Sequence, residues 1–187
     1  MSTPALKEWG AAVHALLDGR QQVLLRKGGI HEKRFAIEPA TASVSPFVLF
    51  PTVAHSHAER VRPEHRDLLA AGAADSADEC IVVRATAKVV AAVEVNQPER
   101  IDEIADLHIW TAESVQADRL DFRPRHRLTV LVVAACALAD PLRLPRRPEY
   151  GGCKSWVALD AVAGDAEPVL APEVLAATAQ RVRLLLG

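Results

Sequence analysis

Residues 81–94 read IVVRATAKVVAAVE and contain the clearest periodic pattern in the chain. Apolar residues occupy every second position from Ile81 to Val93, and the side chains of a β-strand alternate between its two faces. The pattern therefore predicts one long strand, or two strands joined by a bend. The other face carries Arg84, Thr86 and Lys88, which indicates a surface turned towards water or an anion.

Shorter apolar runs predict the remaining strands. Residues 47–50, 128–138 and 155–159 each have the length and composition of a strand, and residues 22–26 and 30–37 predict a hairpin with Gly28 and Gly29 in its turn. Capping and periodicity predict helices over residues 3–17, 64–71, 98–107, 112–120 and 172–186, with Thr111 as an N-cap.

The order of these elements favours one fold class. Strands and helices do not alternate regularly, which favours an α+β fold with a mostly antiparallel sheet and several peripheral helices. We further expect the sheet to be barrel-like. This expectation is an analogy with the small barrels of RNA-binding modules associated with pseudouridine synthases, and it concerns the fold alone. We expect residues 1–160 to form a single domain and residues 161–187 to form a linker and an amphipathic helix that packs on it.

Composition describes an ordinary globular chain of 187 residues with a formal net charge of −2. This charge gives no global attraction to nucleic acid or to anionic membranes. The three cysteines are far apart, which argues against a disulfide framework. No secretory signal is evident, and the longest apolar run is shorter than the roughly 20 residues of a membrane span. These features predict a cytoplasmic protein without a membrane partner.

Two basic turns are the candidate binding elements. Arg26 and Lys27 precede the Gly28-Gly29 pair, whose glycines permit a positive φ and a close approach of a ligand to the backbone. The second turn covers residues 121–127. We expect both turns at one end of the sheet, where they would bind phosphate of nucleic acid or a nucleotide. The candidate ligand-binding residues are Arg26, Lys27, Gly28, Gly29, Thr52, His55, Arg123, Arg125, Lys154 and Ser155. The alternative interpretation is a tight turn with a solvated Arg-Lys pair.

A second hypothesis is enzymatic. His55, His57 and Glu59 follow the strand at residues 47–50, and two histidines at i and i+2 with a nearby carboxylate suit a divalent metal. Such a site would indicate a metal-dependent hydrolase or nuclease. A purely structural, partner-binding subunit is the third class. The sequence does not decide among the three classes, nor does it reveal a substrate or an oligomeric state.

Six phrases, taken in order, carry a family resemblance: LKEWGAAVHALLDG, QVLLRKGGI, FVLFPT, HIWT, FRP and YGGCKSWVAL. Together they resemble a bacterial family known as domain of unknown function 1802. The resemblance covers residues 5–159 and implies no established activity. Its landmarks are Trp9, Arg26, Lys27, Gly28, Gly29, Phe50, Pro51, Thr52, His55, Trp110, Arg123, Pro124, Gly152, Cys153, Ser155 and Trp156.

Overall fold

The computed structural model describes residues 3–27, 45–53, 57–161 and 163–187. In this part of the chain, strands form a seven-stranded sheet. They are β1 (Thr3–Trp9), β2 (Val23–Lys27), β3 (Phe47–Thr52), β4 (Cys80–Glu94), β5 (Leu128–Pro145), β6 (Trp156–Leu159) and β7 (Ala166–Pro168).

The strand order is β2-β5-β4-β3-β1-β6, and β7 pairs with β5. The pairing of β1 with β3 is parallel, and the other pairings are antiparallel. The expected α+β fold with a mostly antiparallel sheet is therefore confirmed. Among the described residues no pairing joins β2 to β6, so the sheet is open and the expected closure into a barrel is not confirmed.

Helices and helical turns surround this sheet. They are α1 (Gly10–Leu17), α2 (His57–Arg60), η1 (Pro63–His65), α3 (Leu68–Ala74), η2 (Pro98–Leu107), α4 (Ala112–Val115), η3 (Gln116–Asp121), η4 (Pro148–Tyr150) and α5 (Pro172–Leu186). Thr111 Oγ1 accepts a hydrogen bond from Ser114 N at 3.2 Å, which confirms the predicted N-cap. None of the helices in the described ranges is long and apolar enough to cross a membrane.

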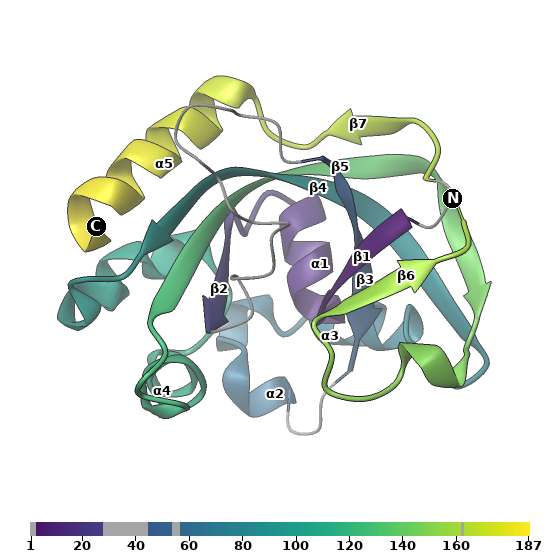
Figure 1. The fold of residues 1–187 in the computed structure, drawn as a ribbon, viewed down its shortest axis with the longest axis horizontal. Coiled ribbons are helices and arrows are strands. Elements are labelled where there is room, and N and C mark those ends of the chain that lie inside the picture. The colour runs from purple at the N-terminus through teal and green to yellow at the C-terminus, as the bar shows by residue number, and fades with distance from the viewer. Residues whose placement is uncertain (1–2, 28–44, 54–56, 162) are drawn as a thin grey trace.

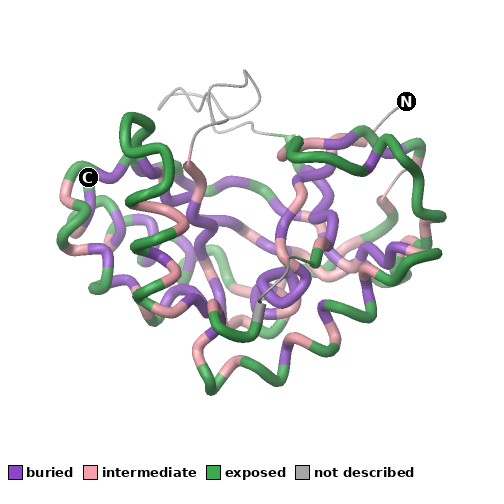
Figure 2. Tube along the Cα trace, turned by 90° about the horizontal axis from the view of Figure 1, so that it is seen from below, coloured by how far each residue is buried: buried purple, intermediate pink, exposed green. Residues whose placement is uncertain are grey.

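Apolar residues are buried on both faces of the curved sheet, since the consecutive residues Val130, Leu131 and Val132 of β5 are all buried. Figure 1 shows β4 and β5 arching over α1, with α5 along the outside of this arch. Leu175, Ala179 and Val182 of α5 belong to the same buried cluster as residues of β2 and β5, so the C-terminal helix shares the core of the sheet. In Figure 2 the buried stretches run through the middle of the molecule, and the exposed stretches lie around its rim.

The alternation in residues 81–94 is confirmed in β4. The apolar positions from Ile81 to Val93 are buried, whereas Lys88 and Glu94 on the other face are exposed. The register with β5 shifts between Val83 and Ala85 and again between Val89 and Ala91. Irregularities of this kind bend and twist a strand. They explain how a 15-residue strand follows the curve in Figure 1.

The helix expected over residues 3–17 is wrong in its first half. Residues Thr3–Trp9 form β1, which pairs with β3 on one side and with β6 on the other, and α1 begins only at Gly10. Ala5 and Leu6 are fully buried by these pairings. Partners that are distant in sequence outweigh a local helical pattern, because local propensity is a weak determinant.

Two further boundaries differ from the sequence-based expectation. β5 continues to Pro145 instead of ending near residue 138, because its second half pairs with the start of β4. The segment expected as a linker contains β7, which pairs with residues 136–138 of β5. The predicted Gly28-Gly29 turn and the return strand at residues 30–37 lie outside the described residues.

A contact between two glycines fixes α1 against α3. A Cβ atom at Gly10 would lie 2.5 Å from the carbonyl oxygen of Gly72, and a Cβ atom at Gly72 would lie 2.5 Å from the backbone nitrogen of Ala11. Neither neighbour is a flexible side chain that could move aside. The backbones of the two helices therefore touch, and this approach requires glycine on both sides.

We predict that Gly10→Ala lowers the free energy of unfolding by about 1–3 kcal/mol, because the added methyl group overpacks a backbone contact. The matched control is Gly164→Ala, because a Cβ at Gly164 meets nothing within 4 Å. Urea unfolding of the two variants tests the prediction. Equal stability of both variants would contradict it.

His108 is buried at the end of η2 beside the Arg62 guanidinium. Arg62 donates hydrogen bonds of 2.6 Å to the carbonyl oxygens of Ala105 and His108. The Nδ1 atom of His108 accepts from the backbone N–H of Trp110 at 3.2 Å. Burial, reinforced by the positive charge of Arg62, lowers the pKa of His108 to about 4. His108 is therefore neutral in the folded protein at neutral pH.

This pKa predicts an acid-sensitive fold. In the unfolded chain His108 takes up its proton near its ordinary pKa of 6.5, so the unfolded state binds more protons as the pH falls below this value. The free energy of unfolding should therefore fall by roughly 3 kcal/mol between pH 6.5 and 4. Urea unfolding at several pH values measures the effect. His108→Gln should flatten the profile across this window, and an unchanged profile in that variant would contradict the assignment.

Candidate functional site

A cleft of about 950 Å³ opens where β1 and β3 end. Because these strands are parallel and paired up to Trp9 and Thr52, their carboxyl ends lie side by side. η3 and the loop at residues 151–155 complete the walls. Arg26 of β2 reaches the same place, although β2 and β1 are not neighbours in the sheet: its Nη1 lies 3.5 Å from Lys7 O and from Glu8 Oε2.

The lining of the cleft is rich in positive charge. Five basic side chains contribute, from β1, β2, η3, the end of β5 and the loop before β6: Lys7, Arg26, Arg119, Arg146 and Lys154. Two carboxylates, those of Glu8 and Asp78, also line it. A concave surface with this imbalance concentrates anions, even in a chain whose net charge is −2.

Most of these cations lack a carboxylate partner. Within the described part of the chain, Arg26 forms an ion pair with Glu8, and the other four basic side chains of the cleft form none. Lys7 Nζ instead donates to the carbonyl oxygens of Gly151 and Gly152, at 3.2 and 3.0 Å. Arg146 Nη2 donates to Ser76 O at 2.9 Å. These bonds position the charges without neutralising them.

Arg119 differs from the other four because one of its donor atoms is buried without a partner among the described residues. Its Nη1 donates to Asp118 O at 3.2 Å, whereas its buried Nε has no hydrogen-bond partner among the described residues. Burial lowers the pKa of Arg119, and the nearby carboxylate of Glu8 opposes this shift. A buried charged donor without an acceptor is costly, and native structures rarely keep one without a reason. The small cavity on its other side, about 10 Å³, has room for at most about one water molecule.

Glu8 organises the floor of the cleft. It is buried, its Oε1 accepts from the backbone N–H of Trp9 at 2.9 Å, and its Oε2 faces Arg26. Thr52 Oγ1 donates to the carbonyl oxygen of Glu8 at 3.1 Å, which ties β3 to β1 across the floor. The carboxylate holds Arg26 in place and lowers the cost of keeping Arg119 nearby.

The loop at residues 151–155 is shaped by Gly152, whose φ of +77° favours glycine. Lys7 binds the carbonyl oxygens of this loop, and burial lowers the pKa of Lys7, with the Cys153 thiol acting in the opposite direction. The loop thereby presents Lys154 and Ser155 along one wall of the cleft.

The structure places the ligand-binding residues proposed from the sequence in different parts of the molecule. Arg26, Thr52, Lys154 and Ser155 come together in the cleft. Lys27 faces the other side of β2, because neighbouring side chains of a strand point in opposite directions, and lines a separate pocket.

The remaining proposed residues do not join either group. Arg123 and Arg125 are exposed and line neither pocket. Arg123 has a φ of +50°, and its guanidinium lies 5.1 Å from the centre of the Phe122 ring. The basic turn does lie beside the end of β2, since Lys27 pairs with Leu128. Gly28, Gly29 and His55 lie outside the described residues.

Sequence reasoning missed five charged residues of the cleft: Lys7, Glu8, Asp78, Arg119 and Arg146. Lys7 and Glu8 fall within the helix expected over residues 3–17, whereas they belong to a strand at the edge of the cleft. One feature of the sequence could have located the cleft. Many landmarks of the family resemblance line the cleft, namely Trp9, Arg26, Phe50, Pro51, Thr52, Gly152, Cys153 and Ser155.

The metal hypothesis stays a prediction. His55 and the side chain of His57 lie outside what the structure describes, and Glu59 is exposed. Among the described residues, no group of three histidine, cysteine or acidic side chains could hold a metal ion.

The comparison with known families is decisive at the level of the family. The sequence model described as "Domain of unknown function (DUF1802)" matches residues 5–181. The chain belongs to the DUF1802 family. None of the curated proteins compared with this DUF1802 chain matches it.

The fold of the DUF1802 chain was also compared with solved structures, and one of the matches is a crystal structure from a bacterium. It is described as the crystal structure of a mutant of the ZmASCH protein from Zymomonas mobilis, with 12% sequence identity and a TM-score of 0.42. The match covers 83% of this chain and 87% of that chain. Similarity at this level carries no argument about function.

The unsatisfied state of Arg119 leads to a prediction. Arg119 is partly buried, and replacing a cation whose buried donor has no partner among the described residues with an apolar side chain of similar length removes a cost of burial. Arg119→Met should therefore raise the free energy of unfolding by roughly 1 kcal/mol, measured by urea unfolding. Arg125→Met is the matched control, because Arg125 is exposed and its removal should change stability little. A clear loss of stability in Arg119→Met would show that Arg119 has a structural role instead.

Proposed function

We propose that this DUF1802 protein binds a phosphate-bearing ligand, nucleic acid or a nucleotide, in the cleft between β1, β3 and η3. The observation that carries the proposal is the set of four cations without a carboxylate partner in the described part of the chain, with Arg119 Nε unsatisfied among them. Lys7 and Arg146 are held by carbonyl oxygens, so they are positioned while their charge remains available to a ligand.

Phosphate is the anion that this arrangement suits best. Arg26 and Arg119 offer planar guanidinium groups, which bind phosphate oxygens in a bidentate manner, and Lys154 offers a mobile point charge. Hydroxyl groups of Thr52 and Ser155 and the backbone of the 151–155 loop are also within the lining. Contacts of these kinds dominate the binding of nucleic-acid backbones.

The size of the cleft fits the same interpretation. Small-molecule sites occupy about 300–1,000 Å³, and the cleft lies at the upper end of this range. It therefore admits a nucleotide or a short single-stranded segment. The cations come from several elements around one hollow, which suits a ligand with more than one phosphate. A cytoplasmic location, expected from the sequence, accords with such a ligand and remains part of the proposal.

Fluorescence anisotropy with short labelled single-stranded RNA and DNA tests the proposal, with unlabelled nucleotides as competitors. If about four phosphates are neutralised, the affinity should fall about fifty-fold between 50 and 200 mM salt. Arg26→Ala and Arg119→Met should each weaken binding by about tenfold or more, since each removes a charge-assisted contact.

Two control variants separate the cleft from general surface charge. Arg143→Ala removes a cation outside the cleft and should leave the affinity nearly unchanged. Arg125→Ala reports whether the basic turn contributes as well. The proposal fails if no probe binds at low salt, or if the two cleft variants bind as tightly as the wild type.

A further inference from the structure

A second pocket, of about 420 Å³, lies on the other side of β2 from the cleft. It is bounded by the end of β2, the start of β5, the start of η2 and the turn η3, and its volume is in the range of small-molecule sites. Arg26 lines the cleft and Lys27 lines this pocket, so two adjacent residues of one strand serve two different surfaces.

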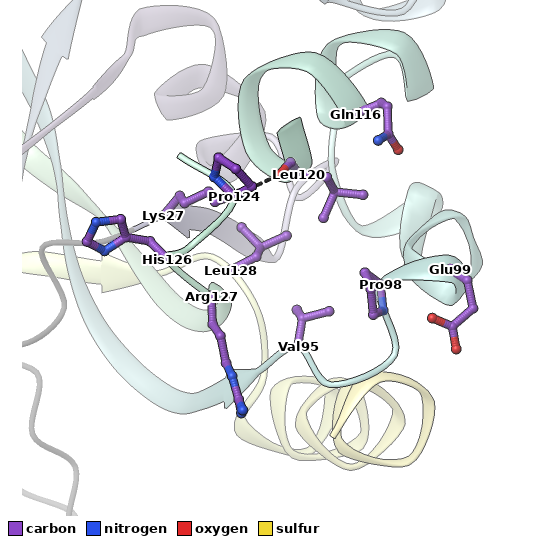
Figure 3. A pocket seen from close by; sticks show the side chains of 10 residues that line it. All are labelled: Lys27, Val95, Pro98, Glu99, Gln116, Leu120, Pro124, His126, Arg127 and Leu128. Atoms are coloured by element: carbon purple, nitrogen blue, oxygen red, sulfur yellow. Dashed lines mark hydrogen bonds between the residues drawn. The ribbon is translucent and has the colours of Figure 1, made fainter. Parts of the chain in front are cut away.

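The floor of this pocket is apolar. Val95 and Leu128 are buried beneath it, and Pro98, Leu120 and Pro124 form its walls. Figure 3 shows these side chains between two polar edges, with Lys27, His126 and Arg127 on one side and Glu99 and Gln116 on the other. The pocket thus combines an apolar body with a cationic edge.

Lys27 is the central group of the cationic edge. Its Nζ donates one hydrogen bond, to Leu120 O, which is the dashed line in Figure 3. An ammonium group has three N–H donors, and in the described part of the chain Lys27 forms no ion pair. Burial lowers the pKa of Lys27, and Asp121 opposes this shift from an exposed position. An anion in the pocket would satisfy the open donors.

Arg127 also lines the pocket, but its guanidinium is already paired. Its Nη1 bonds to Glu94 and to Asn96 Oδ1, neither of which lines the pocket. In Figure 3 the guanidinium points away from the Lys27 side chain. Lys27 is therefore the cation that a ligand on the apolar floor can reach.

We propose that this pocket is a second ligand site and that it takes a small aliphatic carboxylate. The aliphatic part would lie on Val95 and Leu128, and the carboxylate would accept from Lys27. Each feature selects against a simpler ligand: the apolar floor favours an alkyl chain over a bare anion, and the Lys27 ammonium favours a carboxylate over an amine. The proposal does not rest on the phosphate function of the cleft.

Three probes test the site on the full chain: hexanoate, hexylammonium and acetate. In two-dimensional ¹H–¹⁵N NMR, hexanoate should shift the amide signals of Lys27, Val95 and Leu128 saturably, with a Kd in the millimolar range or tighter. Hexylammonium lacks the anion and acetate lacks the alkyl chain, so each should bind at least about tenfold more weakly.

Variants complete the test. Lys27→Met should weaken hexanoate binding several-fold, whereas Lys88→Gln on the exposed face of β4 and Arg127→Gln should not. Lys27→Gln removes the same charge with a polar side chain and keeps the test valid even if Lys27→Met fails to fold. Arg26→Ala should leave hexanoate binding unchanged while it weakens phosphate binding in the cleft. Equal binding of hexanoate and hexylammonium, or unchanged binding in a folded Lys27 variant, would overturn the proposal.

Discussion

The long antiparallel ladder between β4 and β5 extends from the pair Cys80 and Pro145 to the pair Glu94 and Thr129, and two irregularities in its register bend both strands. This bend lets the sheet curve over α1, so that residues of α1, β2 and β5 form one buried cluster. It also determines where the proposed phosphate-binding cleft lies. Without the curve, β2 would lie at the far edge of a flat sheet and Arg26 could not approach Glu8 of β1.

If the cleft binds phosphate as we propose, its charges illustrate a conflict between stability and binding. Several charged side chains elsewhere in the molecule are paired: Arg84 contacts Asp75, Arg100 contacts Glu103 and Arg181 contacts Asp106. In the cleft the pattern changes. Lys7 and Arg146 donate hydrogen bonds to carbonyl oxygens instead of carboxylates, and Arg119 Nε has no acceptor among the described residues. Proteins commonly accept such local violations where a ligand supplies the missing group.

Sequence reasoning succeeded where a single local signal decides the structure. The period-two pattern predicted β4 and its buried face, Thr111 predicted a helix start, and Pro172 predicted the start of α5. It failed for Thr3–Trp9, because the partners of this strand are residues 47–52 and 156–159, and no local pattern reports them.

The candidate site was predictable only in part. Arg26 and Lys27 were grouped as one cluster, although the alternation of a strand already implies that they face opposite sides. The burial of Arg119 depends on how η3 packs against its neighbours, which is a tertiary property that the sequence alone does not express.

The most direct test of the central claim observes Arg119 itself. The Nε–H groups of arginine side chains give their own NMR signals, and a guanidinium that gains a phosphate partner shifts its signal and exchanges more slowly with water. On titration with a nucleoside triphosphate at low salt, we expect saturable shifts of the Nε–H signals of Arg119 and Arg26. Unchanged signals for these two residues, with shifts confined to Arg123 and Arg125, would contradict it.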